Sequence, residues 1–285
     1  MNQEKSSASP YYLLAKAERL AGEHVHPAWR GQVANAHAPR AKQMVLKWLD
    51  SHLAICAELA TALAAQTLKL PVPLPAVVIA SREDLPGLPN SATEDHVILI
   101  GSEYKEPEIF FAQGMNNNPA AEEFVWNKLC SSPTGPSGAA WDELIANDDR
   151  HFQNALFDGQ NWWLFDHDRA LQNSGGFCKD PNDLQTRLEL IDFRAKCNLL
   201  AEQTVDRHKH NHGIEAQPIA FEKQKTALAI LRHEVKNWSH PEPKINAIYS
   251  TTAILLDAIE LRLPALAQHI QTRIARPNAK ELSWD

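Results

Sequence analysis

The sequence predicts an α+β protein with a small, sheet-containing N-terminal lobe and a mainly helical C-terminal lobe that share a cleft. Two observations lead to this prediction. Before residue 104 the chain alternates short apolar segments, typical of strands, with one long helical segment, whereas from about residue 183 the apolar periodicity is mostly helical. A single hairpin pattern separates the two kinds of sequence, as expected for two packed layers around a shared site.

Composition sets the broad class. Of 285 residues, 44% are hydrophobic and 22% charged, which is typical of a globular protein and excludes collagen-like, disordered and disulfide-scaffold chains. We expect a cytoplasmic protein, because no apolar run could span a bilayer and the N-terminus lacks the apolar segment of a secretory signal. The net charge of -7 argues against a direct nucleic-acid partner. The cysteines show no CxxC spacing and are expected to be free thiols: Cys56, Cys130, Cys178 and Cys197.

The chain divides into three predicted parts. Residues 1–10 are polar, end at Pro10 and predict a flexible tail. Residues 11–104 form the N-terminal lobe, and residues 105–285 form the C-terminal lobe.

The N-terminal lobe is expected to run strand, helix, strand, strand. Prolines and a glycine interrupt residues 23–42, which predicts loop and edge structure. The apolar run that follows predicts a buried strand, and a helical stripe that Ser51 can cap comes next, ending at a proline-rich stretch. The expected strands and helix are 43–49, 51–70, 76–80 and 96–100.

The C-terminal lobe begins with helical patterns and a loop. Residues 120–130 and 141–146 read as helices around a loop at 131–138. Residues 147–154 are polar and loop-like, and residues 155–168 predict a hairpin with Asp158-Gly159 at its tip. The remainder is expected to form the helical core of this lobe.

The polar loop and the hairpin hold the residues that phosphoryl transfer needs. Asp149 can accept the proton of an attacking hydroxyl, and oxygen ligands such as Asn154 and Asp166 can hold Mg²⁺ against phosphates. In protein kinases the catalytic Asp and the metal-binding Asn are also five residues apart, and a metal-binding Asp follows. A tight loop and a hairpin would bring these three side chains to one place.

The N-terminal lobe offers a matching pair. Lys47 lies inside an apolar strand, where an unpaired ammonium would be costly, so it should meet a carboxylate or an anion. Glu58 follows on the predicted helix. Their order matches the kinase arrangement, in which a strand lysine contacts the phosphates and a helix glutamate holds that lysine.

Taken together, Asn-Asp-Asp-Arg-His-Phe-Gln-Asn (147–154) and Phe-Asp-His-Asp (165–168) resemble motifs of the HipA-like kinases. This is a bacterial branch of the protein-kinase-like fold that is also similar to the phosphatidylinositol kinases. The resemblance covers roughly residues 40–172 and implies ATP and Mg²⁺ as cofactors. It implies these roles: Asp149 as catalytic base, Asn154 and Asp166 as Mg²⁺ ligands, Lys47 as the ATP-phosphate lysine, Glu58 as its partner, and Gly101, Ser102 and Glu103 as the adenine-contacting hinge.

The chain departs from the kinase pattern at two places. It has no GxGxxG motif, and only Gly31 with its small neighbours could cover the phosphates. Asp166 is followed by His167-Asp168 in place of Phe-Gly.

Several residues have two interpretations. Asp148 could replace Asp149 as base, both could be simple turn formers, and Lys47 could be a lysine that ends its strand in solvent. Asp168 would support the site as a second metal ligand or would only pair with Arg150 or Arg169. His151 would support the loop by bonding backbone carbonyls. The alternating cluster His208, His210 and His212 could bind a metal or be a solvated loop.

The predicted function is phosphoryl transfer from ATP, with a protein Ser/Thr hydroxyl as the first candidate acceptor and an antitoxin-like protein as a candidate partner. A small molecule or lipid is the alternative acceptor. A nucleotide-binding pseudokinase would explain the missing glycine-rich loop, and a metal phosphohydrolase would use His151, His167 and Asp168 as ligands.

Overall fold

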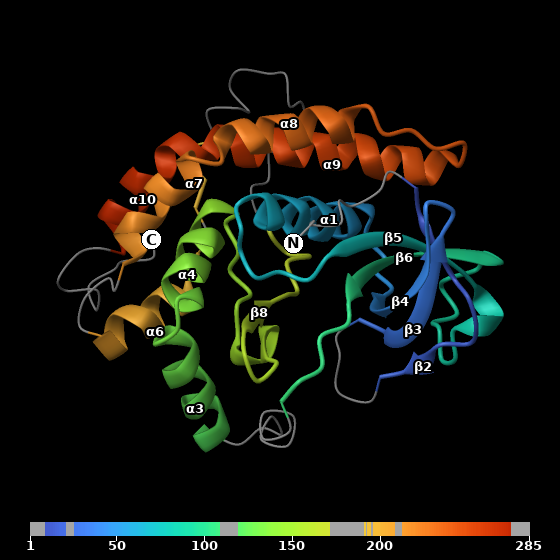
Figure 1. The fold of residues 1–285 in the computed structure, drawn as a ribbon, viewed down its shortest axis with the longest axis horizontal. Coiled ribbons are helices and arrows are strands. Elements are labelled where there is room, and N and C mark those ends of the chain that lie inside the picture. The colour runs from blue at the N-terminus through green and yellow to red at the C-terminus, as the bar shows by residue number, and fades with distance from the viewer. Residues whose placement is uncertain are drawn as a thin grey trace.

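The computed structural model describes residues 9–20, 26–108, 119–171, 191, 193–194, 196–208 and 213–274. Figure 1 shows a curled sheet at one end of the molecule and helices at the other, with α1 (His52–Thr67) between them. The predicted division into a sheet-containing N-terminal region and a helical C-terminal region is therefore confirmed. Most of the predicted tail lies outside the described residues, as do His210 and His212 of the histidine cluster.

The sheet curls until its first strand pairs with two others. Its order is β1-β5-β6-β4-β3-β2, and β1 is parallel to β5 but antiparallel to β3. The predicted order of strand, helix, strand, strand is confirmed by β4, α1, β5 and β6. The strands are β1 (Tyr11–Leu13), β2 (Glu18–Arg19), β3 (Ala28–Asn35), β4 (Ala38–Lys47), β5 (Pro75–Ser81) and β6 (His96–Glu103).

The loop predicted at residues 23–42 is wrong for most of its length, because β3 and β4 form a long antiparallel hairpin there. The expected strand-breaking residues have other reasons to be present. Pro27 precedes β3, where a missing N–H costs little. A Cβ on Gly31 would lie 2.7 Å from a methyl of Leu13 and 3.1 Å from one of Leu46, so this glycine allows close packing inside the curled sheet.

Strand periodicity decides which side chains face the site. Met44 and Leu46 of β4 point into the core inside the curled sheet, so Val45 and Lys47 lie on its other face. The strands β5 and β6 are buried on both faces, since alternate residues contact either that core or the larger core around α1. This explains why their sequences are continuous apolar runs.

Helix α1 is buried on nearly all sides. Ser51 caps it by accepting a hydrogen bond from the Ala54 N–H at 3.3 Å. The helix packs against β5 and β6 on one side and against α8 (Lys225–Lys236) and α9 (Pro243–Arg262) on the other (Figure 1). Glu58 lies in its buried middle, which positions a carboxylate inside the protein.

The helical region surrounds the hairpin of β7 (Ala155–Phe157) and β8 (Trp162–Leu164), which confirms the predicted hairpin. Helix α4 begins at Thr134, inside the predicted loop 131–138. Pro136 fits the first turn of this helix, and Gly138 leaves room for the side chains of Leu164 and Leu200. The other helices are α3 (Pro119–Cys130), α6 (Leu199–His208), α7 (Gln217–Glu222) and α10 (Leu266–Arg273).

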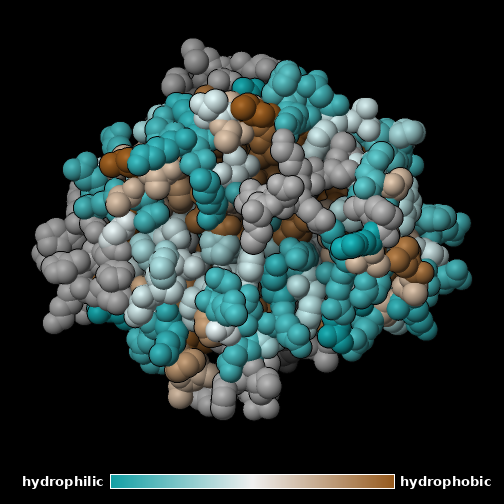
Figure 2. Space-filling view, in the orientation of Figure 1, coloured by the Kyte–Doolittle hydropathy of each residue, from teal (hydrophilic) through white to brown (hydrophobic). Residues whose placement is uncertain are grey.

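The face in Figure 2 is mostly hydrophilic, with hydrophobic residues in small separate groups. In the part of the chain that the structure describes, no helix has the length and apolar character to cross a membrane.

Candidate functional site

A cluster of charged residues from three segments lies where the sheet meets the hairpin. Lys47, the last residue of β4, forms ion pairs with Asp166 and, at 3.0 Å, with Asp168. Both aspartates follow β8. The two motifs that the sequence places more than a hundred residues apart therefore meet, and Lys47 is not a strand-ending lysine in solvent.

The pKa values in this cluster follow from burial and from the neighbouring charges. Burial by itself would lower the pKa of Lys47, but Asp166, Glu58 and Asp168 outweigh burial and raise it. Burial would raise the pKa of Asp166, and Lys47 overrides this effect and lowers it. The pKa of Asp168 is raised, first by its burial and then by the charge of Asp166. Lys47 and Asp166 are therefore the firmly ionised pair.

Glu58 lies beside this cluster but has a different bond. Its carboxylate accepts a hydrogen bond from the His167 N–H at 2.5 Å, while the ion pairs of Lys47 go to the two aspartates. Burial raises the pKa of Glu58 to about 7, although Lys47 opposes this rise. The expected ion pair between Lys47 and Glu58 is therefore not formed. Glu58 instead binds the backbone N–H of His167, which lies between the two aspartates that pair with Lys47.

Arg150 fixes the relative positions of the loop and the hairpin end. Its guanidinium donates two bonds to Asp142 of α4, at 3.0 and 2.9 Å, and the pair is fully buried. It also donates to the carbonyls of Asn154 at 2.8 Å and Phe165 at 2.9 Å, and contacts His167 Nε2 at 2.9 Å. Asp166 adopts the left-handed backbone conformation, with φ of 63°, and this network holds it there.

The polar loop presents Asp149 to solvent and turns Asn154 inward. Asn154 donates its amide N–H to the Asp149 carbonyl at 2.9 Å, so its amide oxygen is turned elsewhere. The Asp149 carboxylate is 35% exposed and pairs with Arg169 at 3.2 Å. In contrast, one carboxylate oxygen of Asp148 is buried. The geometry favours Asp149 over Asp148 as the group that can reach a substrate.

Arg262, the last residue of α9, stabilises the end of α4, from which the polar loop starts. Arg262 of α9 is buried and donates to the carbonyls of Leu144 at 2.6 Å and Glu143 at 3.1 Å, where α4 ends. Ala146 then turns the chain with a φ of 50° into the polar loop. A charged donor at a helix C-terminus satisfies carbonyls that have no partner in the helix.

A pocket of about 300 Å³ leads away from the charged cluster. Lys47, Glu58 and Asp166 line one end of it. Apolar residues of the sheet and of the hairpin line the rest of the pocket: Ala28, Val45, Ile100, Leu156 and Phe165. Its far end is lined by Ser102, Glu103, Tyr104 and Lys105, since the register of β4 with β6 places Ile100 opposite Lys47 and Ser102 opposite Val45, farther along the strand.

The far end has the chemistry of a hinge that could bind a base. The N–H groups of Glu103 and Tyr104 donate to the carbonyls of Leu74 and Gln43. Among the described residues, the Lys105 N–H is the first in this segment that donates to no protein group. The Lys105 ammonium lies 4.1 Å from the centre of the Trp163 ring and pairs with Glu103 at 3.1 Å.

Three residues chosen from the sequence lie elsewhere than expected. Gly101 lies between the pocket-lining residues Ile100 and Ser102 but does not line the pocket, and a Cβ on it would meet Val78 and Met44 inside the sheet. Gly31 lies within β3 and is not a phosphate-covering loop. His151 bonds the Asn154 N–H through its own carbonyl, at 2.9 Å, and Arg150 supplies the bracing expected of its imidazole.

Asp168 also has a different partner from those expected. Asp168 pairs with Lys47, and one of its carboxylate oxygens lies 3.8 Å from His26 Nε2. The two expected partners pair elsewhere: Arg169 with Asp149 and Arg150 with Asp142. The metal phosphohydrolase interpretation loses a ligand, because His167 is fully buried with its Nε2 against Arg150. Burial and the two nearby cations hold the pKa of His167 well below its ordinary value.

Asp166 and Asn154 have the oxygen-ligand chemistry that Mg²⁺ prefers. The lowered pKa of Asp166 keeps its carboxylate ionised, and the Asn154 amide oxygen accepts no hydrogen bond from the described residues. Phe165 donates its N–H to the Asn154 carbonyl at 3.2 Å, which ties the two candidate ligands together. Mg²⁺ needs only one or two protein ligands when phosphates and water supply the others.

Sequence reasoning missed the residues that hold this site together. Asp142, Asn147 and Arg169 were not chosen, although Asn147 donates to Asp142 at 2.9 Å and accepts from the Asp149 N–H at 3.2 Å. Asp142 could have been noticed in the sequence, because it is a charged residue within the apolar pattern of α4. Lys105 and Trp163 carry no such signal, because only the fold brings them together.

Comparison with known proteins bears on the fold alone. No protein-family model matches the chain, and no curated protein matches its sequence. Among solved structures, the fold is similar to that of the Helicobacter pylori proinflammatory kinase CtkA, with a TM-score of 0.53 and 10% sequence identity. The likeness covers 90% of this chain and 97% of that one. Membership of the HipA-like family stays a prediction, and the mixed α+β structure is consistent with a kinase-like fold.

Proposed function

We propose that the protein is an ATP- and Mg²⁺-dependent phosphotransferase of HipA-like type, with two lobes that meet at the pocket. The observation that carries the proposal is the ion pair of Lys47 with Asp166 at one end of a pocket whose other end is a hinge-like segment. Asn154 lies next to this end, because its carbonyl accepts a hydrogen bond from the N–H of Phe165, the residue before Asp166. The similarity of the fold to a protein named as a kinase supports it. A protein Ser/Thr hydroxyl is the proposed acceptor, and phosphorylation of the chain itself is included.

The pocket suits adenosine in its middle. An adenine ring would lie between Val45 and Ala28 on the sheet side and Leu156 and Phe165 on the hairpin side. The Lys105 N–H would donate to the ring, as the free amide of the hinge segment. A mostly apolar cavity with a few well-placed polar groups is typical of such ligand sites.

The charged end suits the phosphates and the acceptor. Lys47 would bind phosphate oxygens, and Asp166 and Asn154 would hold Mg²⁺, which neutralises charge on the phosphates during transfer. Asp149 would accept the proton of the attacking hydroxyl through the carboxylate oxygen that Arg169 leaves open. Arg169 would orient that carboxylate.

Phosphate transfer by matched variants tests the proposal. We would incubate three proteins with ATP, Mg²⁺ and acceptor peptides: the parent, Asp149→Asn and Asp206→Asn. Mass spectrometry then measures the phosphate added to the protein and to the peptides. Asp206 is an exposed acid on α6 and serves as the control. Asp149→Asn should transfer on the order of 10²–10⁴ times more slowly while binding ATP normally, because only the base is lost.

The alternative functions predict other results. Transfer by Asp149→Asn at the parent rate would contradict the assignment of the base. Labelling of a small molecule or lipid in place of protein would change the acceptor class. Mg²⁺-dependent ATP binding without phosphate on any acceptor would indicate a nucleotide-binding module.

A further inference from the structure

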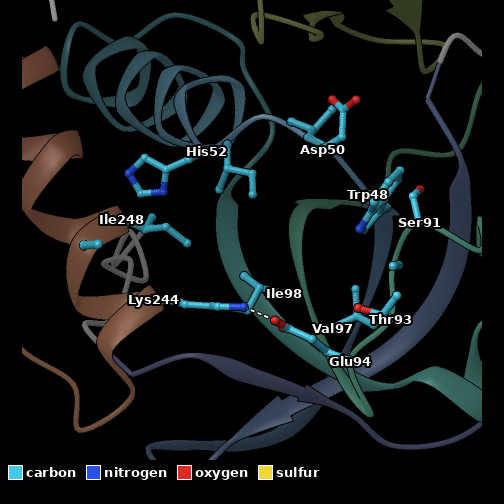
Figure 3. Close-up of a pocket in the computed structure, with 14 residues that line it drawn as sticks. Trp48, Asp50, His52, Ser91, Thr93, Glu94, Val97, Ile98, Lys244 and Ile248 are labelled. Carbon is cyan, nitrogen blue, oxygen red and sulfur yellow. Dashed lines mark hydrogen bonds and ion pairs between the residues drawn. The ribbon is translucent and has the colours of Figure 1, made fainter.

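A second, larger pocket shares no lining residue with the proposed nucleotide site. Its volume is about 420 Å³, and it opens where the loop before β6, the connection from β4 to α1 and the first turns of α9 meet. Figure 3 shows its walls: His52, Ile248 and Lys244 on one side, and Trp48, Ser91 and Thr93 on the other. Ile55, Val97 and Ile98 supply an apolar floor.

Several polar groups at the rim are available for hydrogen bonds with a ligand. Among the described residues, the Trp48 indole N–H, the hydroxyls of Ser91 and Thr93 and the Asp50 carboxylate have no protein hydrogen-bond partner. An apolar floor with a few polar groups around it is the usual form of a small-molecule site. The rim is also accessible, because Asp50, Ser91 and Thr93 are exposed.

The charges of the rim favour a cation. Asp50 and Glu94 carry two negative charges, and Lys244 supplies one positive charge through its ion pair with Glu94. Both partners of that pair are more than half exposed, so a competing ammonium group can replace Lys244 at little cost. The indole of Trp48 adds a ring face, on which a cation or an aromatic ring can bind.

We propose that this pocket binds a small organic cation with an aromatic body, and that its occupant regulates the nucleotide site. The regulatory part rests on the proposed function. One wall of the pocket is the segment that joins Lys47 to Glu58, and it supplies Trp48, Leu49, Asp50, His52 and Ile55. A ligand that fixes this segment acts directly on the two ends that line the nucleotide pocket. By linkage, the nucleotide must change the affinity of the ligand by the same factor.

Three probes with the same ring and different charge test the binding. Tryptamine, indole and indole-3-acetate are titrated into the full chain, and the Trp48 indole N–H signal, identified with Trp48→Phe, is followed by NMR. We expect tryptamine to shift this signal and to bind roughly tenfold more tightly than indole-3-acetate. An unmoved Trp48 signal, or tightest binding of the anion, would overturn the proposal.

Two variants on one helix separate the pocket from its surroundings. Ala247 of α9 lines the pocket and is exposed, whereas Ser250, on the same helix, is exposed but lies outside the lining. Ala247→Trp should abolish tryptamine binding, and Ser250→Trp should leave it unchanged. Asp50→Asn should bring the affinity for tryptamine close to that for indole, which keeps the test decisive if Ala247→Trp fails to fold. Binding that survives Ala247→Trp in a folded protein would contradict the site.

The regulatory part has its own readout. The affinity for Mg²⁺·ATP is measured with and without saturating tryptamine, in the parent and in Ala247→Trp. We expect a change of about fivefold or more in the parent alone. An unchanged affinity would overturn the regulation and leave the binding site standing. If ATP does not bind at all, the proposed function fails, while the tryptamine titration still decides the pocket.

Discussion

Two neighbouring ion clusters, one around Arg150 and one around Lys47, differ in their accessibility to solvent and ligands. Arg150 and Asp142 are fully buried, and Arg150 is occupied by bonds to Asp142, Asn154, Phe165 and His167. Lys47 and Asp166, in contrast, are partly exposed and line a pocket. The first cluster holds backbone in place, whereas the second has charge that a ligand can use.

The structural and the functional cluster also differ in how many like charges lie close together. Burial raises the pKa values of Glu58 and Asp168, and the neighbouring carboxylates of the Lys47 cluster raise them further. Such crowding of like charge costs stability and is typical of functional sites. Asp142 faces a single cation with ideal two-bond geometry and pays no such cost.

The largest expected effect comes from breaking the structural cluster. Asp142→Asn should lower the free energy of unfolding by about 3–5 kcal/mol, because it leaves the buried Arg150 charge without a counter-ion. Urea unfolding followed by circular dichroism measures this. A loss below about 1 kcal/mol would mean that Arg150 finds another counter-charge or water, and the distinction between the clusters would not hold.

The next largest effect is a pH dependence of stability that arises from Glu58. Its pKa is about 7 in the folded protein, against an ordinary value of 4.5, so the folded state binds a proton that the unfolded state has released. Stability from this group is therefore lost as pH rises from about 5 to about 8. Glu58→Gln should be as stable as the parent near pH 5 and more stable by about 1–3 kcal/mol near pH 8. Urea unfolding at both pH values checks this, and a difference that does not change with pH would contradict the raised pKa.

A smaller effect is expected from the same chemical change in the functional cluster. Asp166→Asn removes a carboxylate that repels Glu58 and Asp168, while Lys47 keeps Asp168 as its partner. The free energy of unfolding should change by less than about 1 kcal/mol in either direction. It is the matched control for Asp142→Asn, measured in the same way. A loss as large as that of Asp142→Asn would show that both clusters are structural.

The smallest effect on stability concerns Arg169. Its pair with Asp149 is exposed, with 58% of the Arg169 side chain accessible, so Arg169→Ala should cost at most about 0.5 kcal/mol. If Arg169 orients the base, the same variant should slow phosphate transfer by roughly tenfold at saturating ATP. Arg169→Lys should recover part of this rate. Parent-like transfer by Arg169→Ala would remove its positioning role.

Much of the fold follows from local patterns, whereas the site depends on pairings that no local pattern contains. The apolar runs of β5 and β6 and the Asp-Gly tip of the hairpin are readable from the sequence. The hairpin of β3 and β4 was missed because Gly31 and the nearby prolines read as breaks, although a glycine there fills a packing need.

The candidate site shows the same limit. The kinase-like spacing selects Asp149, Asn154 and Asp166, and the structure places Asn154 and Asp166 on adjoining backbone. The partner of Lys47 could not be predicted, because three carboxylates compete for it and only the fold decides. Lys105 and Trp163 gain their contact from the path of the chain after β6.

The Lys47 cluster is proposed to bind phosphates and Mg²⁺. The decisive measurement is calorimetric titration of ATP, with and without Mg²⁺, into the parent and into Asp166→Asn. We predict that Mg²⁺ strengthens ATP binding to the parent and that this strengthening is lost in Asp166→Asn, which still folds. Equal Mg²⁺ dependence in both proteins, or no ATP binding to the parent, would contradict the account.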